Sequence, residues 1–117
     1  MTTLTVEKQS TTIAKRVEVA TSIAQKTLGL MFSKDLGNKD ALLIESCNSI
    51  HTFFMNYPID VIFLSKENIV VKIFRNLKPW RMTLMYFKAS KCLEFMGGTL
   101  CENVVVGDKL EIKECIN

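Results

Sequence analysis

The chain has 117 residues, which predicts a single domain over residues 1–117 that can bury a core without staples. With 48% hydrophobic and 23% charged residues, the composition excludes an intrinsically disordered protein. The net charge of +3 comes from 15 basic and 12 acidic residues along the whole chain, a balance that does not favour a nucleic-acid partner.

Targeting and membrane signals are missing from the sequence. Residues 1–15 contain no apolar core of signal-peptide length, and no apolar run approaches the roughly 18 residues that cross a bilayer. We therefore expect a cytoplasmic protein without a membrane partner. Without export, the cysteines are expected to be reduced, although a hyperthermophilic source would permit disulfides; they are Cys47, Cys92, Cys101 and Cys115. One histidine and no C-x2-C pair leave the usual zinc spacing unmet, so no metal or cofactor is predicted.

The first half of the chain shows strand patterns and one helix pattern. Residues 1–11 are polar, with residues 4–6 indicating an edge strand or a frayed arm. Alternation over residues 16–20 predicts a half-buried strand. Ser22 and Gln25 have the spacing of a capping box, which predicts a short amphipathic helix over residues 23–31. A turn at 35–38 and a short buried strand at 41–44 follow.

Residues 50–64 organise the second half, because Pro58 lies between two apolar runs. We predict two strands joined at a corner there, followed by a hairpin at 65–68 and a strand at 69–75. Residues 82–90 fit helix and strand spacing equally and are predicted to be irregular. Strands are expected at 92–96 and 109–114. Between them, Thr99 and Glu102 have capping-box spacing and predict a helical turn.

These elements amount to six to eight short strands, about two short helices and no regular β-α-β alternation. We predict an α+β fold, in which a mostly antiparallel sheet curls into a small barrel with the helices packed over one end.

Five short motifs give the sequence a resemblance to a known family. They are Gly29-Leu30-Met31, the block at 54–63, the block at 77–81, Leu93-Glu94 with Gly97-Gly98, and Val106-Gly107-Asp108. In this order they resemble the family called domain of unknown function 192, over roughly residues 16–114. The resemblance implies a compact, β-rich single domain of bacteria and archaea, with some exported members and no established activity. The matching positions bring no catalytic role; they are Gly29, Met31, Met55, Pro58, Asp60, Pro79, Glu94, Gly97, Gly107 and Asp108.

Three titratable residues are candidates for catalysis. Asp60 enters an apolar strand, so its carboxylate either accepts backbone amides at the Pro58 corner or faces a ligand. Glu94 is either an outward or network-forming glutamate or the partner of Asp60 in an acid–base pair. His51 is either a partly buried, satisfied histidine or a general base. These three residues define one hypothesis, a small hydrolase or transferase. A Cys-His nucleophile using Cys47 or Cys92 has no further support in the sequence.

Trp80 is flanked by Lys78, Pro79 and Arg81. It either caps the core or stacks on a planar ligand beside cations that would pair with an anion. Our leading hypothesis is a small-ligand or partner-binding module with Trp80, Arg81 and His51 at its site, closed by residues 76–90. A third hypothesis is nucleic-acid binding through the dispersed cations of residues 72–91, against a merely solvated basic face.

Overall fold

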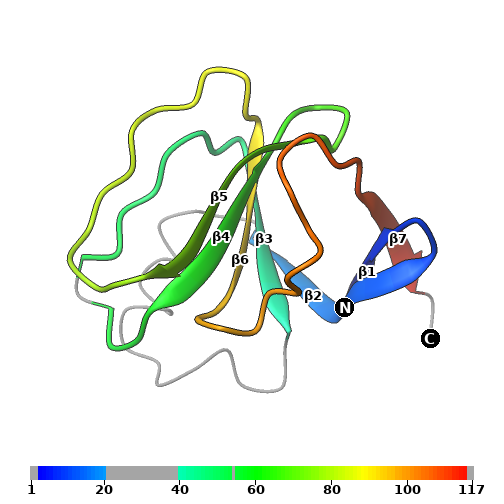
Figure 1. Cartoon of the computed structure of the whole chain (residues 1–117), viewed down its shortest axis with the longest axis horizontal. Coiled ribbons are helices and arrows are strands. Elements are labelled where there is room, and N and C mark those ends of the chain that lie inside the picture. Colours follow the sequence, from blue (N-terminus) through cyan, green and yellow to red (C-terminus); the bar gives the residue numbers. More distant parts are fainter. Residues whose placement is uncertain (1–2, 21–39, 54, 116–117) are drawn as a thin grey trace.

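The computed structural model describes residues 3–20, 40–53 and 55–115, which form one seven-stranded mixed sheet (Figure 1). The order across the sheet is β5-β4-β6-β3-β2-β1-β7, and every pair is antiparallel except β2 with β3. The strands are β1 (Thr3–Lys8), β2 (Thr11–Ala20), β3 (Ala41–Glu45), β4 (Ile59–Leu64), β5 (Val70–Leu77), β6 (Lys91–Met96) and β7 (Glu111–Cys115).

The predicted α+β class is wrong, because the described residues contain strands and loops and no helix. The helix expected at 23–31 and the turn at 35–38 lie outside the described residues. The predicted barrel is also wrong, since the sheet is open with β5 and β7 at its edges. An isolated bridge between Ile69 and Lys109 joins the segments just before these edge strands, without continuing into a ladder.

The helical turn predicted at residues 99–102 is a loop, because side chains from elsewhere occupy its backbone groups. The Thr99 hydroxyl donates to the carbonyl of Met96 at 2.7 Å instead of capping a helix. Arg75 of β5 donates to the carbonyls of Leu100, Cys101 and Val104, at 2.9, 2.9 and 3.3 Å. Those carbonyls are therefore satisfied across the fold, and no helical hydrogen bonds are needed.

Most of the predicted strands are confirmed, with two differences. β1 lies inside the sheet between β2 and β7, so the segment is neither an edge strand nor a frayed arm. The first strand expected within residues 50–56 is absent from the described part of that stretch, where His51 makes a single bridge to Met82. The corner before β4 and the hairpin at 65–68 are present, the latter closed by the Asn68 amide on the Ser65 carbonyl at 3.0 Å.

The core lies on both faces of the sheet, because successive side chains of a strand point to opposite faces. One face buries Ile62 and Leu93 against β1, β2 and the residue 100–110 segment. The other buries Phe63 and Cys92 under residues 47–57 and 86–89. Burial on both faces explains the four consecutive apolar residues in each of β3 (residues 41–44) and β4 (residues 61–64).

Asp60 is one of four buried polar side chains among the described residues, with 1% of its surface exposed. Its Oδ1 accepts the Asn76 amide at 2.7 Å, and its Oδ2 accepts the amides of Gly98 and Leu100 at 3.0 Å each. One carboxylate thus ties β4 to the end of β5 and to the loop after β6. Three charge-assisted bonds compensate the burial of this charge.

We predict that Asp60→Ala lowers the free energy of unfolding by about 3 kcal/mol, because three amides lose their acceptor inside the protein. The matched control is Asp40→Ala. Asp40 is exposed and accepts the amides of Lys15 and Arg16 at 2.8 and 3.2 Å, so about 1 kcal/mol or less is expected. Urea denaturation measures both, and equal losses would contradict the role given to Asp60.

Candidate functional site

A buried threonine, Thr52, joins residues 50–53 to residues 78–83. Its amide donates to the Arg81 carbonyl at 2.8 Å, and its carbonyl accepts the Trp80 amide at 2.9 Å. Its hydroxyl donates to the Lys78 carbonyl at 2.7 Å and accepts the Arg81 amide at 2.8 Å. With none of its surface exposed, Thr52 fixes the backbone of residues 78–81 against the body of the protein.

Thr83 makes the reciprocal contact from the other segment. Its amide donates to the Ile50 carbonyl at 3.0 Å, and its hydroxyl accepts the Ile50 amide at 3.0 Å. The bridge between His51 and Met82 lies between the two threonines. Further along, the Tyr86 amide donates to the Asn48 carbonyl at 2.9 Å. Residues 78–88, called here the display loop, are therefore held by their backbone along a second segment of the chain.

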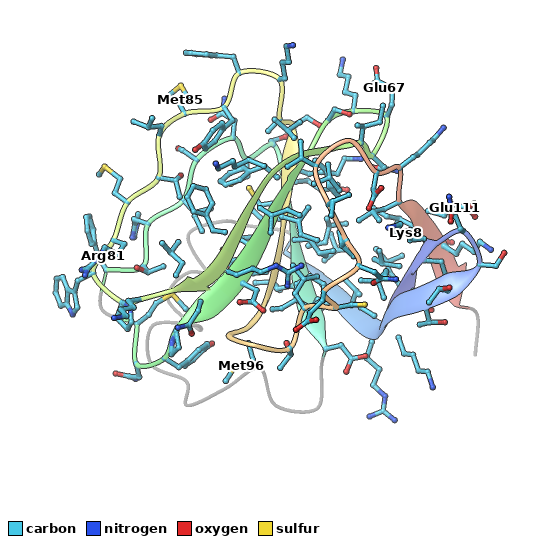
Figure 2. All side chains as sticks on the ribbon, in the orientation of Figure 1. Lys8, Glu67, Arg81, Met85, Met96 and Glu111 are labelled. Carbon is cyan, nitrogen blue, oxygen red and sulfur yellow. The ribbon has the colours of Figure 1, made fainter. Side chains whose placement is uncertain are left out.

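The display loop directs large apolar side chains into solvent. Figure 1 shows this segment, in yellow, along the outer edge of the molecule, and Figure 2 shows Arg81 and Met85 pointing away from the body. The exposed fractions are 56% for Trp80, 69% for Met82, 76% for Leu84, 54% for Met85 and 83% for Phe87. Single exposed apolar residues are ordinary, whereas such a series on an ordered backbone indicates a contact surface.

An aromatic row adjoins the loop and contains two of the three predicted ligand-binding residues, His51 and Trp80. The rings of His51 and Phe53 stack with centroids 4.9 Å apart, and Phe53 lies 6.0 Å from Trp80. His51 is exposed, so the expectation of a partly buried histidine is wrong. Trp80 is also exposed and has a φ of 64°, so it does not cap the core, and its backbone conformation is unusual for a bulky residue.

The charge of this surface is positive. Lys78, Arg81 and Lys88 are exposed, and no ion pair involves them among the residues that the structure describes. The sequence contains no acidic residue between Glu67 and Glu94. Other cations of the predicted basic segment are engaged elsewhere: Arg75 holds three carbonyls, and the Lys91 ammonium bonds Asn68. Lys72 is exposed as well, with its ammonium over the Phe74 ring. Three of the six cations of this segment are thus exposed on the display loop.

A second group of titratable side chains lies in the core, where Glu94, Cys47 and Cys92 are all buried. Within the described part of the chain, Oε2 of Glu94 is buried without a hydrogen-bond partner. Burial raises the pKa of Glu94 from its ordinary 4.5 to about 8, and the nearby Cys47 adds to this shift. The Glu94 carboxyl is therefore protonated at neutral pH.

Cys47 and Cys92 are free thiols beside this carboxyl. Cys47 donates to the Ser49 carbonyl at 3.1 Å, and Cys92 donates to the Cys47 carbonyl at 3.5 Å. The hydrogen bond between the two thiols lowers the pKa of Cys47, although burial acts in the opposite direction. The same bond raises the pKa of Cys92, and burial raises it further. Both are buried, and the cluster is part of the apolar packing.

The structure does not assemble the proposed catalytic residues. Asp60 pairs with Phe95, and Val61 pairs with Glu94, so the two carboxyl groups point to opposite faces of the sheet. His51 lies outside the core with Phe53. Two cavities of about 380 and 420 Å³ are lined by residues of β2 and β6 and of β1 and β7, respectively, with adjoining loop residues, and by none of these three residues. Among the described residues, no group of three histidine, cysteine or acidic side chains could hold a metal ion.

The fold and the site together define a small β-rich domain with an open mixed sheet and an exposed, apolar, basic loop. The profile of DUF192, described as an uncharacterised family, matches residues 3–112, so the chain belongs to this family. The resemblance inferred from the motifs is confirmed.

Known relatives share the family name and no stated activity. A UPF0127 protein of Pyrococcus horikoshii is 37% identical over 100 residues, covering 81% of this chain and 85% of the relative. A UPF0127 protein of Pyrococcus abyssi is 32% identical over 110 residues, covering 90% and 92%.

Two crystal structures share the fold. A protein of unknown function from Novosphingobium aromaticivorans has a TM-score of 0.73 at 24% identity, covering 92% of this chain and 82% of its own. A Sinorhizobium meliloti protein that carries the provisional name of a transcription regulator has a TM-score of 0.75 at 21% identity, covering 94% and 92%. At these identities the likeness shows the fold alone.

Sequence reasoning grouped His51, Trp80 and Arg81 but missed the residues that hold them. Thr52 and Thr83 are the only buried threonines among the described residues, and each bonds a partner about thirty residues away. The strand parity of residues 50–56 gave no signal for them, because this stretch is not a strand.

We predict that Thr52→Val, which keeps the side-chain shape but removes the hydroxyl, lowers the free energy of unfolding by about 2 kcal/mol. It also speeds hydrogen exchange at the Arg81 amide, which loses its acceptor. Thr99→Val is the control, since the Thr99 hydroxyl makes one bond at an exposed position, and a loss below about 1 kcal/mol is expected. Unchanged exchange at Arg81 in Thr52→Val would contradict the role of this hydroxyl.

The raised pKa of Glu94 predicts a pH dependence of stability. Between about pH 4.5 and 8 the unfolded chain releases this proton while the folded protein keeps it, so the free energy of unfolding falls as pH rises. The slope from this group approaches about 1.4 kcal/mol per pH unit within that window. Glu94→Gln removes this contribution, whereas the exposed Glu102→Gln keeps it. Urea titrations at pH 5, 7 and 9 measure the slopes, and parallel slopes for Glu94→Gln and the wild type would refute the assignment.

Proposed function

We propose that this domain is a binding module whose contact surface is the display loop with the neighbouring aromatic row. Its partner carries apolar groups and negative charge. The observation that carries the proposal is the exposure of five large apolar side chains, from Trp80 to Phe87, on a backbone that is hydrogen-bonded to the protein body. No enzymatic activity is proposed, because the candidate acids are buried on opposite faces of the sheet.

The energetics of the surface support binding. Full burial of a Leu, Met or Phe side chain stabilises a complex by about 1.5–3 kcal/mol. Each exposed apolar side chain of the display loop can therefore add to the binding free energy when a partner covers it. The backbone bonds at Thr52 and Thr83 already order the loop. The entropy cost of ordering a loop on binding is thereby reduced. The exposed cations add attraction for an anionic partner at the rim of the apolar surface.

We predict that the native protein binds 8-anilinonaphthalene-1-sulfonate, a probe that is aromatic, apolar and anionic. Trp80 is the only tryptophan, so energy transfer from its indole to the probe reports binding beside the loop. Phe87→Ser combined with Leu84→Ser is expected to weaken binding at least tenfold, because about 1.4 kcal/mol corresponds to a factor of ten and two apolar groups are lost.

The matched control replaces two exposed valines elsewhere, Val105→Ser with Val106→Ser, which are 54% and 58% exposed. This variant is expected to bind the probe as the wild type does. The proposal is refuted if the native protein does not bind the probe, or if both double variants lose binding equally.

A further inference from the structure

We infer that the display loop docks the protein on an anionic lipid bilayer, with Trp80, Met82, Leu84, Met85 and Phe87 inserted at the level of the headgroups. This inference rests on the proposed function and names its partner. No helix in the described part of the chain is long and apolar enough to cross a membrane. The expectation of no membrane partner rested on the lack of a spanning segment, which a surface contact does not need.

The shape of the surface favours a bilayer. The backbone of the display loop runs along an outer edge of the molecule (Figure 1). Between its exposed apolar residues, Thr83 is buried and Tyr86 is half-buried. The two described cavities are lined by other parts of the protein. A protruding edge offers a protein partner little concave complementarity, whereas a fluid bilayer accepts protruding apolar groups without a matching shape.

The residue types fit the depth profile of an interface. Trp80 has an apolar ring with a polar nitrogen, which is the side chain preferred at the boundary between headgroups and acyl chains. Leu84 and Phe87 are purely apolar and the most exposed of the series, at 76% and 83%. Lys78 and Lys88 lie at the two ends of the loop. Their ammonium groups can reach lipid phosphates while the apolar side chains between them insert.

The charges argue against the other occupants. A second copy of this chain would bring the cations Lys78, Arg81 and Lys88 against their own equivalents, at a cost in repulsion. Nucleic acid would pair its phosphates with the cations and stack its bases on the aromatic rings, but it would leave the aliphatic side chains of Met82, Leu84 and Met85 without an apolar contact. An anionic bilayer uses both the cations and the aliphatic side chains. An acidic protein remains the competing partner, and the experiment below separates it from lipid.

The experiment uses the full chain with sonicated vesicles, either of phosphatidylcholine alone or of phosphatidylcholine with about 30% phosphatidylglycerol. We expect sedimentation with the anionic vesicles and a blue shift of Trp80 fluorescence, with weak binding to the neutral ones. Binding should decrease as salt rises, because the attraction of the cations is screened. Each neutralised cation should lower the partition coefficient about fivefold, so Lys78→Gln with Lys88→Gln should lower it about 25-fold.

Two variants remove the apolar contribution and control for it. Leu84→Ser with Phe87→Ser should abolish sedimentation with anionic vesicles, while Val105→Ser with Val106→Ser should bind as the wild type does. For charge, the exposed Lys109→Gln is the control and should cause less than a twofold change. All variants are compared with the wild type by urea denaturation, so that loss of binding is assigned only to folded protein.

Three results would overturn the inference. The first is failure of the folded protein to bind anionic vesicles; if it still binds the anilinonaphthalene probe, the binding module stands and its partner is not a bilayer. The second is equal binding to neutral and anionic vesicles. The third is concentration-dependent dimerisation in gel filtration that Leu84→Ser with Phe87→Ser abolishes while vesicle binding is absent, which would identify a second copy as the occupant.

Discussion

The position of the display loop depends on the hydroxyl groups of two threonines. Thr52 and Thr83 come from segments that run side by side, and each hydroxyl bonds the backbone of the opposite segment. Both side chains are buried, so water does not compete for these bonds. Because the backbone of residues 78–83 is satisfied on the inside, its large apolar side chains are left facing outward.

Side chains perform a similar task elsewhere in the fold. Asp60 accepts three backbone amides, from the end of β5 and from the loop after β6, and Arg75 donates to three carbonyls of that loop. The β-strands supply the core, and these few polar residues fix the loops to it. The protonated Glu94 differs from them, since its burial weakens the protein as pH rises instead of binding a loop.

Local patterns predicted the strands β3 to β7, because burial on one or both faces of a strand produces a recognisable pattern of apolar residues along it. They did not predict the open sheet, because local patterns do not show whether the edge strands β5 and β7 pair with each other. The helical turn at 99–102 was wrong because its competitors, Arg75 and Asp60, lie 25 or more residues away. The local sequence groups Trp80, Arg81 and His51, and their role in binding stays a prediction. The threonines beneath them were missed because their partners are distant in sequence.

In the folded protein, the display loop is ordered and the indole of Trp80 is exposed to solvent. Trp80 is the only tryptophan, so acrylamide quenching of the native protein measures its exposure directly, and steady-state anisotropy measures its mobility. We expect a quenching constant close to that of the urea-unfolded chain. We also expect the anisotropy of an indole that moves only as the whole folded protein rotates. A shielded indole, or an indole that rotates freely, would contradict this expectation.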